Sequence, residues 1–344
     1  MGTGREGKGK AASWQRLNAS TPQRLNASTP QRLNASTPQR LNASTPQRLN
    51  ASTPQRLTPH KQGNVPRMES PRFNLTGFAD EISPSIDEQV ETLSRLGLSG
   101  LDLRGVDGIN VLDLTLDHLE KILDKVHDAG LKISCVGSPV NKVKYDVMAQ
   151  AREFDRLKRA CYVAQRVNTK RIRIFTPEVP EGSEDELAPK VIEWMKEQRQ
   201  LAKDQEVVLI HENDARFWGA YPENAKRMYG ELGDSHFKAV YDFANDVLLG
   251  YRPKDWFPWL LPHLDTLHIK DAKAAERAIV PAGEGDAEIE ETLRYLIGEG
   301  WNGNLTLEPH LQAAGPMGGF SGAQLFETAV VALRNVLQRA GGVA

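Results

Sequence analysis

From about residue 73 to the C-terminus, short apolar runs alternate with longer segments in which apolar residues recur every three or four positions. Short runs of this kind predict buried strands, and the three- and four-residue spacing predicts amphipathic helices. The pattern predicts eight strands, at 73–78, 100–103, 132–136, 171–175, 207–210, 239–241, 266–269 and 305–307. It also predicts eight helices, at 86–96, 116–129, 149–167, 184–202, 222–232, 253–261, 289–297 and 326–340.

The regular alternation of strand and helix indicates βα units around a parallel sheet. Eight units in a segment of about 270 residues fit a closed (β/α)8 TIM barrel. An open, doubly wound sheet is the second choice, because no glycine-rich phosphate loop follows the first predicted strand. We therefore predict an α/β fold with one TIM barrel domain over residues 71–344.

The first seventy residues follow a different pattern. From Gln15 the octad Gln-Arg-Leu-Asn-Ala-Ser-Thr-Pro runs five times to Pro54. One leucine in eight residues and a proline in every unit cannot build an amphipathic helix or bury a core. We predict that residues 1–70 are a disordered, low-complexity segment, and Met68, just before the first predicted strand, is a candidate translation start.

Composition narrows the class of partner. The formal net charge is −2, which gives no electrostatic reason to expect a nucleic acid or a membrane surface. No apolar run approaches the roughly 18 residues that span a bilayer, and the N-terminus has no apolar signal region. The two cysteines, Cys135 and Cys161, lie in apolar patterns, as buried thiols of a reducing compartment do. We expect a cytoplasmic protein without nucleic-acid or membrane partners.

Candidate chemistry gathers at the ends of the last four predicted strands, where Glu212, Asp242, His268 and Glu308 stand. The carboxyl ends of the strands of a parallel barrel share one rim, and active sites lie there. Three carboxylates and one imidazole suit a hard-to-borderline divalent cation. We expect one ion, Mn²⁺ or Mg²⁺, with Co²⁺ or Zn²⁺ as alternatives.

Further polar residues stand at the ends of the first two predicted strands. Glu81 and Arg104 lie where the hydroxyl groups of a substrate would be. They either contact the substrate or form a structural salt bridge.

Side chains alternate between the two faces of a strand, and this alternation predicts which way three neighbours of the ligand candidates point. Lys270 is two residues after His268, and we expect it either to reach a substrate oxygen or phosphate or to be a solvated loop lysine. His310 follows Glu308 by two residues and is a candidate for substrate contact or for support of a ligand. His211 precedes Glu212 and is expected to point to the opposite face and pack there.

Together with these residues, four motifs resemble the sugar phosphate isomerase/epimerase superfamily of xylose isomerase-like TIM barrels, which is related to family 2 AP endonucleases. The resemblance covers the chain from about residue 73 onward. The motifs are Gly77-Phe-Ala-Asp-Glu-Ile-Ser83, Gly97-Leu-Ser-Gly-Leu-Asp-Leu-Arg104, Gly130-Leu-Lys-Ile-Ser-Cys-Val-Gly-Ser138 and the C-terminal run from Gly283-Glu-Gly-Asp to Glu308.

The resemblance implies that Glu212, Asp242, His268 and Glu308 bind one divalent metal ion. It implies an isomerase or epimerase of a sugar or related polyhydroxy carbonyl compound, acting by proton abstraction and a metal-stabilised enediolate. Glu212 and Glu308 would abstract and return the proton from opposite sides of the substrate carbon. Asn245 is expected to contact substrate; the epimerase branch has a histidine there, which points away from the ketohexose epimerases.

Several alternatives stay open. An inosose dehydratase-like reaction would share the first steps, and a catalytically silent sugar-binding barrel would keep only the fold. A nuclease of the endonuclease IV type is disfavoured because the first four predicted strands end without a histidine. Relatives associate through their barrel helices, so a homo-oligomer is an expectation drawn from the resemblance.

Overall fold

A computed structural model describes residues 72–315 and 318–344. The octad repeats, predicted to be disordered, lie outside these residues. Within the described residues, no helix combines the length and the apolar character that crossing a bilayer requires.

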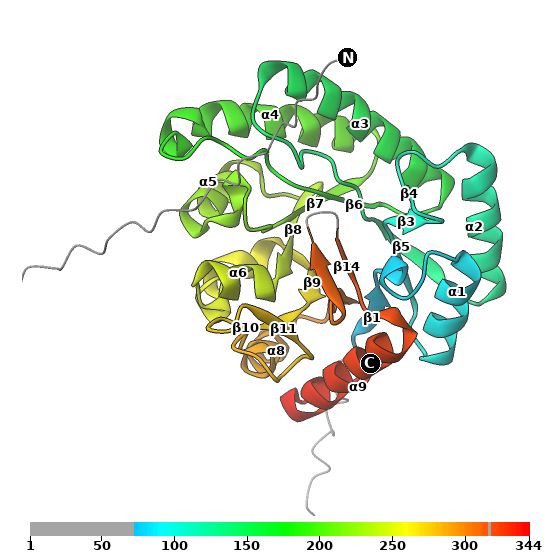
Figure 1. Ribbon diagram of the computed structural model, residues 1–344. Helices are drawn as coiled ribbons and strands as arrows, with labels where there is room; N and C mark the ends of the chain where they lie inside the picture. Colours follow the sequence, from blue (N-terminus) through cyan, green and yellow to red (C-terminus); the bar gives the residue numbers. More distant parts are fainter. Residues whose placement is uncertain (1–71, 316–317) are drawn as a thin grey trace, which may run out of the picture. The chain divides into compact units, whose positions relative to one another are not determined.

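Eight strands form one sheet in the order β1-β12-β9-β8-β7-β6-β5-β2, and every pairing is parallel. Ser99 N donates a hydrogen bond of 2.9 Å to Leu75 O, which links the two end strands where the barrel nearly closes. The predicted (β/α)8 TIM barrel is confirmed (Figure 1). The strands are β1 (Asn74–Gly77), β2 (Gly100–Leu103), β5 (Lys132–Val136), β6 (Arg171–Ile174), β7 (Val208–Glu212), β8 (Phe237–Asp242), β9 (Leu264–Ile269) and β12 (Asn304–Leu307).

Helices surround the sheet in Figure 1. They are α1 (Ile86–Arg95), α2 (Leu116–Asp128), α3 (Val147–Arg166), α4 (Glu184–Asp204), α5 (Pro222–Leu232), α6 (Phe243–Leu249), α7 (Phe257–Leu260), α8 (Ile289–Gly298) and α9 (Gly322–Ala340). Their ends follow the chain's capping residues: the Thr115 side chain accepts from His118 N at the start of α2, and Gly341 ends α9 in the left-handed region.

The predicted helix at 253–261 is wrong in detail. The chain turns directly from β8 into α6, and the region after it is broken into η3 (Pro253–Asp255), α7 and η4 (Leu261–His263). The Asp242 side chain caps α6 by accepting from Asn245 N at 3.0 Å, and Gly250, with φ of 86°, ends it. Prolines within 253–262 then prevent one continuous helix, because each lacks the amide that a helix interior requires.

Three short hairpins extend the loops at the carboxyl ends of the strands. They are β3 (Gly105–Val106) with β4 (Ile109–Asn110), β10 (Asp271–Lys273) with β11 (Ala278–Val280), and β13 (Ala313–Gly315) with β14 (Gly318–Phe320). The pattern of apolar residues did not predict them. They follow β2, β9 and β12, and therefore build up the rim on which the site lies.

The Gly283-Glu-Gly-Asp segment owes its composition to Asp271. The buried carboxylate of Asp271 accepts from Gly283 N at 2.8 Å, Gly285 N at 3.1 Å and Ala287 N at 3.1 Å. A Cβ atom on Gly285 would lie 2.3 Å from Asp271 Oδ1, so only glycine allows this close approach. This loop fixes the chain directly after Lys270.

Most of the apolar core lies between the sheet and the helices, while a small cluster of Cys135, Ile210 and Val240 fills the barrel interior. Cys135 and Cys161 are free and buried, as predicted. Beside the inner cluster, Asp102 accepts hydrogen bonds from Thr76 Oγ1 at 3.0 Å and Thr306 Oγ1 at 3.2 Å. The interior is therefore packed with side chains and partly polar, and in this fold the chemistry is expected at the carboxyl-terminal rim.

Candidate metal centre

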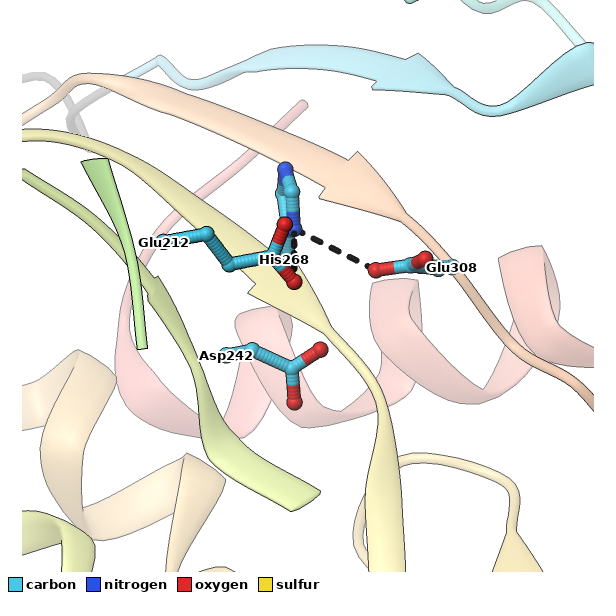
Figure 2. A group of neighbouring side chains, drawn as sticks. All are labelled: Glu212, Asp242, His268 and Glu308. Carbon is cyan, nitrogen blue, oxygen red and sulfur yellow. Dashed lines mark ion pairs between the residues drawn. The ribbon is translucent and has the colours of Figure 1, made fainter. Parts of the chain in front are cut away.

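The four predicted ligand residues lie together at the rim. Glu212, Asp242, His268 and Glu308 are all buried, and one donor atom of each lies within 4.8 Å of the others (Figure 2). His268 Nδ1 lies 3.4 Å from Glu212 Oε1 and 3.2 Å from Glu308 Oε2. Adjacent ligands of an octahedral Mg²⁺ ion lie about 3.0 Å apart, since each is about 2.1 Å from the metal. The separations therefore fit donors around one cation.

The parallel register brings these side chains together. Glu212 and Asp242 are the last residues of β7 and β8, His268 lies in β9, and Glu308 follows β12 directly. Asp242 is the register partner of His268, which in turn pairs with Thr306 of β12. Alternating side chains along a strand point to the same face, so the ligands all point inward.

Asn213 ties two of the ligand strands together at their ends. Its side-chain amide donates to Asp242 O at 3.0 Å and accepts from Asp242 N at 2.7 Å. Sequence reasoning gave Asn213 no role, yet it holds the Asp242 backbone beside the end of β7.

The charges of the site depend on one another. Burial lowers the pKa of His268, but Glu212 and Glu308 outweigh burial and raise it to about 10. Burial raises the pKa of Glu212, yet His268 and Arg173 bring it to about 2. Burial also raises the pKa of Asp242 to about 7, against the attraction of Lys270. The three carboxylates thus need nearby positive charge.

The donor set fits a divalent cation. Both ring nitrogens of His268 are buried without a well-aligned hydrogen bond in the described part of the chain, and Nδ1 faces carboxylate oxygens. Either a proton or a cation can occupy that position, and metal binding would release the proton. Oxygen-rich donors with one imidazole suit Mg²⁺ or Mn²⁺.

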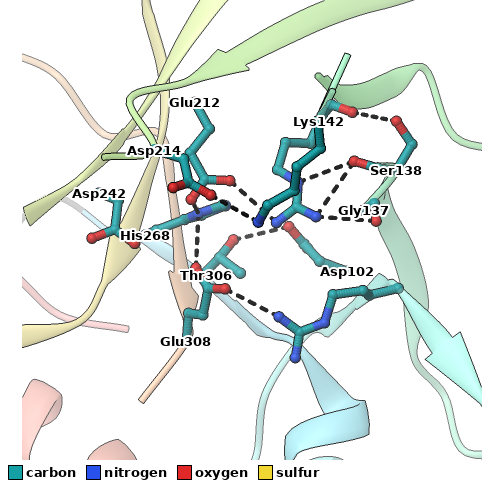
Figure 3. Close-up of polar contacts among 12 residues, drawn as sticks. Asp102, Gly137, Ser138, Lys142, Glu212, Asp214, Asp242, His268, Thr306 and Glu308 are labelled. Atoms are coloured by element: carbon teal, nitrogen blue, oxygen red, sulfur yellow. Dashed lines mark hydrogen bonds and ion pairs between the residues drawn. The ribbon is translucent and has the colours of Figure 1, made fainter. Parts of the chain in front are cut away.

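Each carboxylate also meets a basic side chain. Arg173 Nη1 lies 3.1 Å from Glu212 Oε2, Arg104 Nη1 lies 3.1 Å from Glu308 Oε1, and Lys270 Nζ lies 2.6 Å from Asp242 Oδ2. All three basic residues are buried. Figure 3 shows the polar contacts around Glu212, His268 and Glu308. The basic groups offset the repulsion among the three carboxylates.

Sequence reasoning missed Arg173. Its Nη2 also donates to Gly137 O at 3.2 Å, and the guanidinium lies 4.9 Å from the ring centre of Phe175. A signal was present in the sequence, because the strand Arg-Ile-Arg-Ile at 171–174 carries an arginine on its inward face. Buried arginine requires an acidic partner, and the rim supplies Glu212.

Glu81 and His310 lie beside Glu308, on the side of β1. Glu81 Oε2 accepts from His310 N at 2.8 Å and from Ser321 Oγ at 3.1 Å. His310 Nε2 lies 3.3 Å from both Glu81 Oε1 and Glu308 Oε1. Burial raises the pKa of Glu81 to about 8. The structure therefore places both candidates next to a ligand candidate.

Arg104 forms a salt bridge, which was one of the two roles expected for it; the other was contact with the substrate. Arg104 Nε lies 2.8 Å from Asp80 Oδ2, and its Nη2 lies 3.8 Å from Glu81 Oε1. The same guanidinium also lines a cavity at the rim, so it could contact a substrate bound there. That contact remains a prediction.

Lys270 is buried against Asp242 rather than solvated in a loop. Asn245 is half-buried, and its backbone amide donates to the Asp242 side chain that caps α6. Its predicted substrate contact remains a prediction. His211 points away from the site, as expected: its Nδ1 lies 3.1 Å from Tyr229 OH of α5, and burial lowers its pKa to about 3.

Comparisons with known proteins place the chain among related barrels. The family described as "Xylose isomerase-like TIM barrel" matches residues 90–328. A search of curated proteins finds no significant match.

Three solved structures show the same fold. The IOLI protein with a bound zinc atom has a TM-score of 0.64 at 16% identity, covering 78% of this chain and 99% of that one. The 3-keto-D-glucoside 4-epimerase YcjR from E. coli has a TM-score of 0.59 at 17% identity, covering 77% and 100%. The probable 3-DHS dehydratase AsbF from Bacillus anthracis has a TM-score of 0.59 at 14% identity, covering 76% and 98%.

Identities this low show the fold alone, whereas the family match covers more than half of the chain and starts within α1. The match includes all four ligand candidates. The chain therefore belongs to the xylose isomerase-like TIM barrel family.

Proposed function

We propose that this protein is a divalent-metal-dependent isomerase or epimerase of a sugar or a related polyhydroxy carbonyl compound. One observation carries the proposal: three carboxylates and an imidazole from four consecutive strands of the barrel face one another at the rim. Family membership and the epimerase among the similar structures support it. Mn²⁺ or Mg²⁺ is the proposed ion, from the donor chemistry.

The four ligand candidates would hold the ion. When bound, it supplies Lewis acidity, which polarises the substrate carbonyl and stabilises the negative charge that develops on its oxygen. Coordination by four protein donors leaves about two of six octahedral positions for substrate oxygens. A carbonyl and its adjacent hydroxyl group would fit these positions.

Glu212 and Glu308 are the proposed proton carriers. They approach His268 from β7 and from the end of β12 (Figure 2). Burial raises the pKa of Glu308, but Lys270, His268 and His310 bring it well below its usual range. Both glutamates are therefore ionised at neutral pH, as a general base must be. One would take the proton from the substrate carbon, and the other would return it.

The positions of Arg173 and Arg104 support this assignment. Each guanidinium contacts one oxygen of a proposed base, so each carboxylate is held in one orientation. Fixed carboxylates at the two sides of a bound carbon satisfy the geometric requirement of proton transfer.

A dehydratase is the second candidate, because one similar structure is a probable dehydratase. The same base would remove the proton, and the substrate would then lose a β-hydroxyl group. Trapping the product distinguishes the two reactions: isomerisation conserves the mass of the substrate, whereas dehydration lowers it by one water.

The first test is a metal analysis of the purified protein, followed by a panel of sugars, inositol derivatives and hydroxyketones in deuterated buffer with Mn²⁺. We expect one equivalent of metal and deuterium in one carbon-bound position of a single compound class. Three equivalents of zinc would favour a nuclease. Absence of metal under all loading conditions would favour a silent sugar-binding barrel.

The second test separates metal binding from proton transfer. We expect Glu212→Gln and Glu308→Gln each to lower deuterium exchange by at least about a hundredfold. Glu327→Gln is the matched control, since Glu327 lies on the exposed side of α9 and pairs with Arg95. Full turnover in both site variants with metal still bound would rule out the two-glutamate assignment.

A further inference from the structure

A cavity of ≈ 370 Å³ lies at the rim beside the metal centre. Five of its lining residues are cationic, namely Arg104, Lys142, Arg156, Arg173 and Arg216, and a single lining residue, Asp113, is acidic. The full chain has a formal net charge of −2, so this excess of positive charge is local. Its size is in the range of pockets that bind small molecules.

Two arginines join the cavity to the metal centre. Arg104 contacts Glu308 and Arg173 contacts Glu212, each at 3.1 Å, while both also line the cavity. Figure 3 shows Lys142 on the same side of the ligand residues as Gly137 and Ser138. One small molecule can therefore place a carbonyl at the metal centre and a second group in the cavity.

The inner and outer cations differ in how far they are neutralised. Arg104 and Arg173 are buried and already committed to carboxylates. Lys142 has one carboxylate partner, Asp214, at 2.8 Å, and its Nζ lies 4.8 Å from the ring centre of Phe175. It is a partly exposed charge on the inner wall.

The outer wall holds the least neutralised charges. Arg156 lies 3.4 Å from Glu153, and its side chain is 42% exposed. Arg216 is exposed on the loop after β7, and no carboxylate lies within 4.0 Å of it among residues 72–315 and 318–344. Arginine forks of this kind match carboxylate and phosphate oxygens.

We infer that this cavity binds an anionic group of the substrate, a carboxylate or a phosphate, while the carbonyl end of the same molecule lies at the metal centre. The inference rests on the proposed function, and it narrows the substrate from any polyhydroxy carbonyl compound to an acidic one. A neutral sugar would leave the outer cations facing water and would gain nothing from them.

Two matched pairs of small hydroxyketones test this inference. Hydroxypyruvate and hydroxyacetone differ in a carboxylate against a methyl group, and dihydroxyacetone phosphate and dihydroxyacetone differ in a phosphate. Titration calorimetry on the Mn²⁺-loaded protein gives four dissociation constants. We expect the anionic member of at least one pair to bind about tenfold or more tightly than its neutral partner, and the pair with the larger ratio identifies the anion.

Variants of the lining residues test whether the preference for the anionic compound arises in this cavity. Arg216→Gln is expected to reduce the ratio about fivefold, and Arg156→Gln to reduce it less, because Glu153 already shares its charge. Arg227→Gln, which removes an equal charge from the exposed side of α5, should leave the ratio unchanged. The same titrations at higher salt should weaken the anionic members alone.

The outcomes separate this inference from the proposed function. Equal binding within both pairs, or no binding of either anion at millimolar concentration, overturns the anion site even where metal binds and deuterium exchanges. A preference for the anion that Arg216→Gln and Arg227→Gln affect equally also overturns it. A preference that is lost in Arg216→Gln, in a protein that binds Mn²⁺ but exchanges no deuterium, supports the anion site and defeats the proposed reaction.

Discussion

The two halves of the barrel rim differ in the charged residues that they carry. β7, β8, β9 and β12 deliver the ligand candidates, including all three carboxylates. The other half delivers three cations, Arg104 after β2, Lys142 after β5 and Arg173 in β6, and two acids, Asp80 and Glu81, after β1. The halves meet in the Arg173–Glu212 and Arg104–Glu308 contacts. Because buried like charges repel strongly, a cluster of carboxylates on one half requires the cations of the other.

This division also separates two tasks. The acidic half provides the candidate donors for a cation, and the basic half contacts two of those donors and lines the cavity beside them. If the proposed function holds, metal binding depends mainly on one half and substrate selection mainly on the other, and the Arg173–Glu212 and Arg104–Glu308 contacts couple the two. Substitutions in each half test how far the two tasks are separate.

The largest effect is expected from Arg173→Met. The substitution leaves Glu212 as a buried, unpaired carboxylate and removes the hydrogen bond to Gly137 O. Breaking a buried ion pair costs about 3 kcal/mol of unfolding free energy. Urea unfolding measures this loss, and deuterium exchange should fall with it because Glu212 is no longer oriented.

A matched control lies two residues earlier on the same strand. Arg171 Nε lies 2.6 Å from Asp265 Oδ1, but its side chain is 36% exposed. We expect Arg171→Met to cost about 1 kcal/mol or less. If both variants lose equal stability, the buried Arg173–Glu212 contact contributes no more to the unfolding free energy than the partly exposed Arg171–Asp265 contact.

Lys270→Met should change metal affinity rather than stability. Lys270 is the cation of the acidic half, and its Nζ lies 2.6 Å from Asp242 Oδ2. A lysine charge beside a bound divalent ion repels it, so removal should tighten Mn²⁺ binding about tenfold while deuterium exchange falls. Titration with Mn²⁺ followed by electron paramagnetic resonance measures the affinity. Weaker binding would instead make Lys270 a support of the ligand set.

The two halves also differ in how readily the sequence predicts them. Glu212, Asp242, His268 and Glu308 were found because each stands at the end of an apolar run, and parallel strands end on one rim. Strand and helix bounds agreed closely where apolar residues alternate clearly, as at β2, β5 and α5. Their metal-binding role remains a proposal.

The basic half was harder to predict, because a long cationic side chain in a loop or strand is usually solvated. Whether Arg173 or Lys142 is held at the rim depends on Glu212 and Asp214, which lie far away in the sequence. The helix expected at 253–261 failed for a local reason, because Pro253, Pro258 and Pro262 interrupt this segment. Its apolar residues pack in several short turns, while the Asp242 cap starts the actual helix ten residues earlier.

Asp102→Asn tests the polar layer below both halves. Asp102 is fully buried between Thr76 and Thr306, and burial raises the pKa of its carboxyl group above the usual 3.8. An acid whose pKa is raised by folding destabilises the fold as the pH rises through the folded pKa, and below 3.8 it is protonated in both states. We therefore expect Asp102→Asn to match the wild type at low pH and to exceed its stability by about 1 kcal/mol at neutral pH. Thermal melts across this pH range measure the difference, and a neutral-pH loss would mean that the ionised carboxylate stabilises the rim.

The smallest effect is expected on the outer surface of the barrel, between α1 and α9, where the short distance alone would suggest a strong contact. Arg95 Nη1 lies 2.8 Å from Glu327 Oε2, the same distance that separates Arg104 Nε from Asp80 Oδ2. The Arg95 pair is about half exposed, with side-chain exposures of 51% and 46%, whereas Arg104 is buried. Water and salt screen the exposed pair, so Arg95→Gln should change the unfolding free energy by about 0.5 kcal/mol or less in urea melts. A loss comparable to that of Arg173→Met would show that ion pairs stabilise this barrel whatever their burial, and the contrast between the halves of the rim would then have a cause other than desolvation.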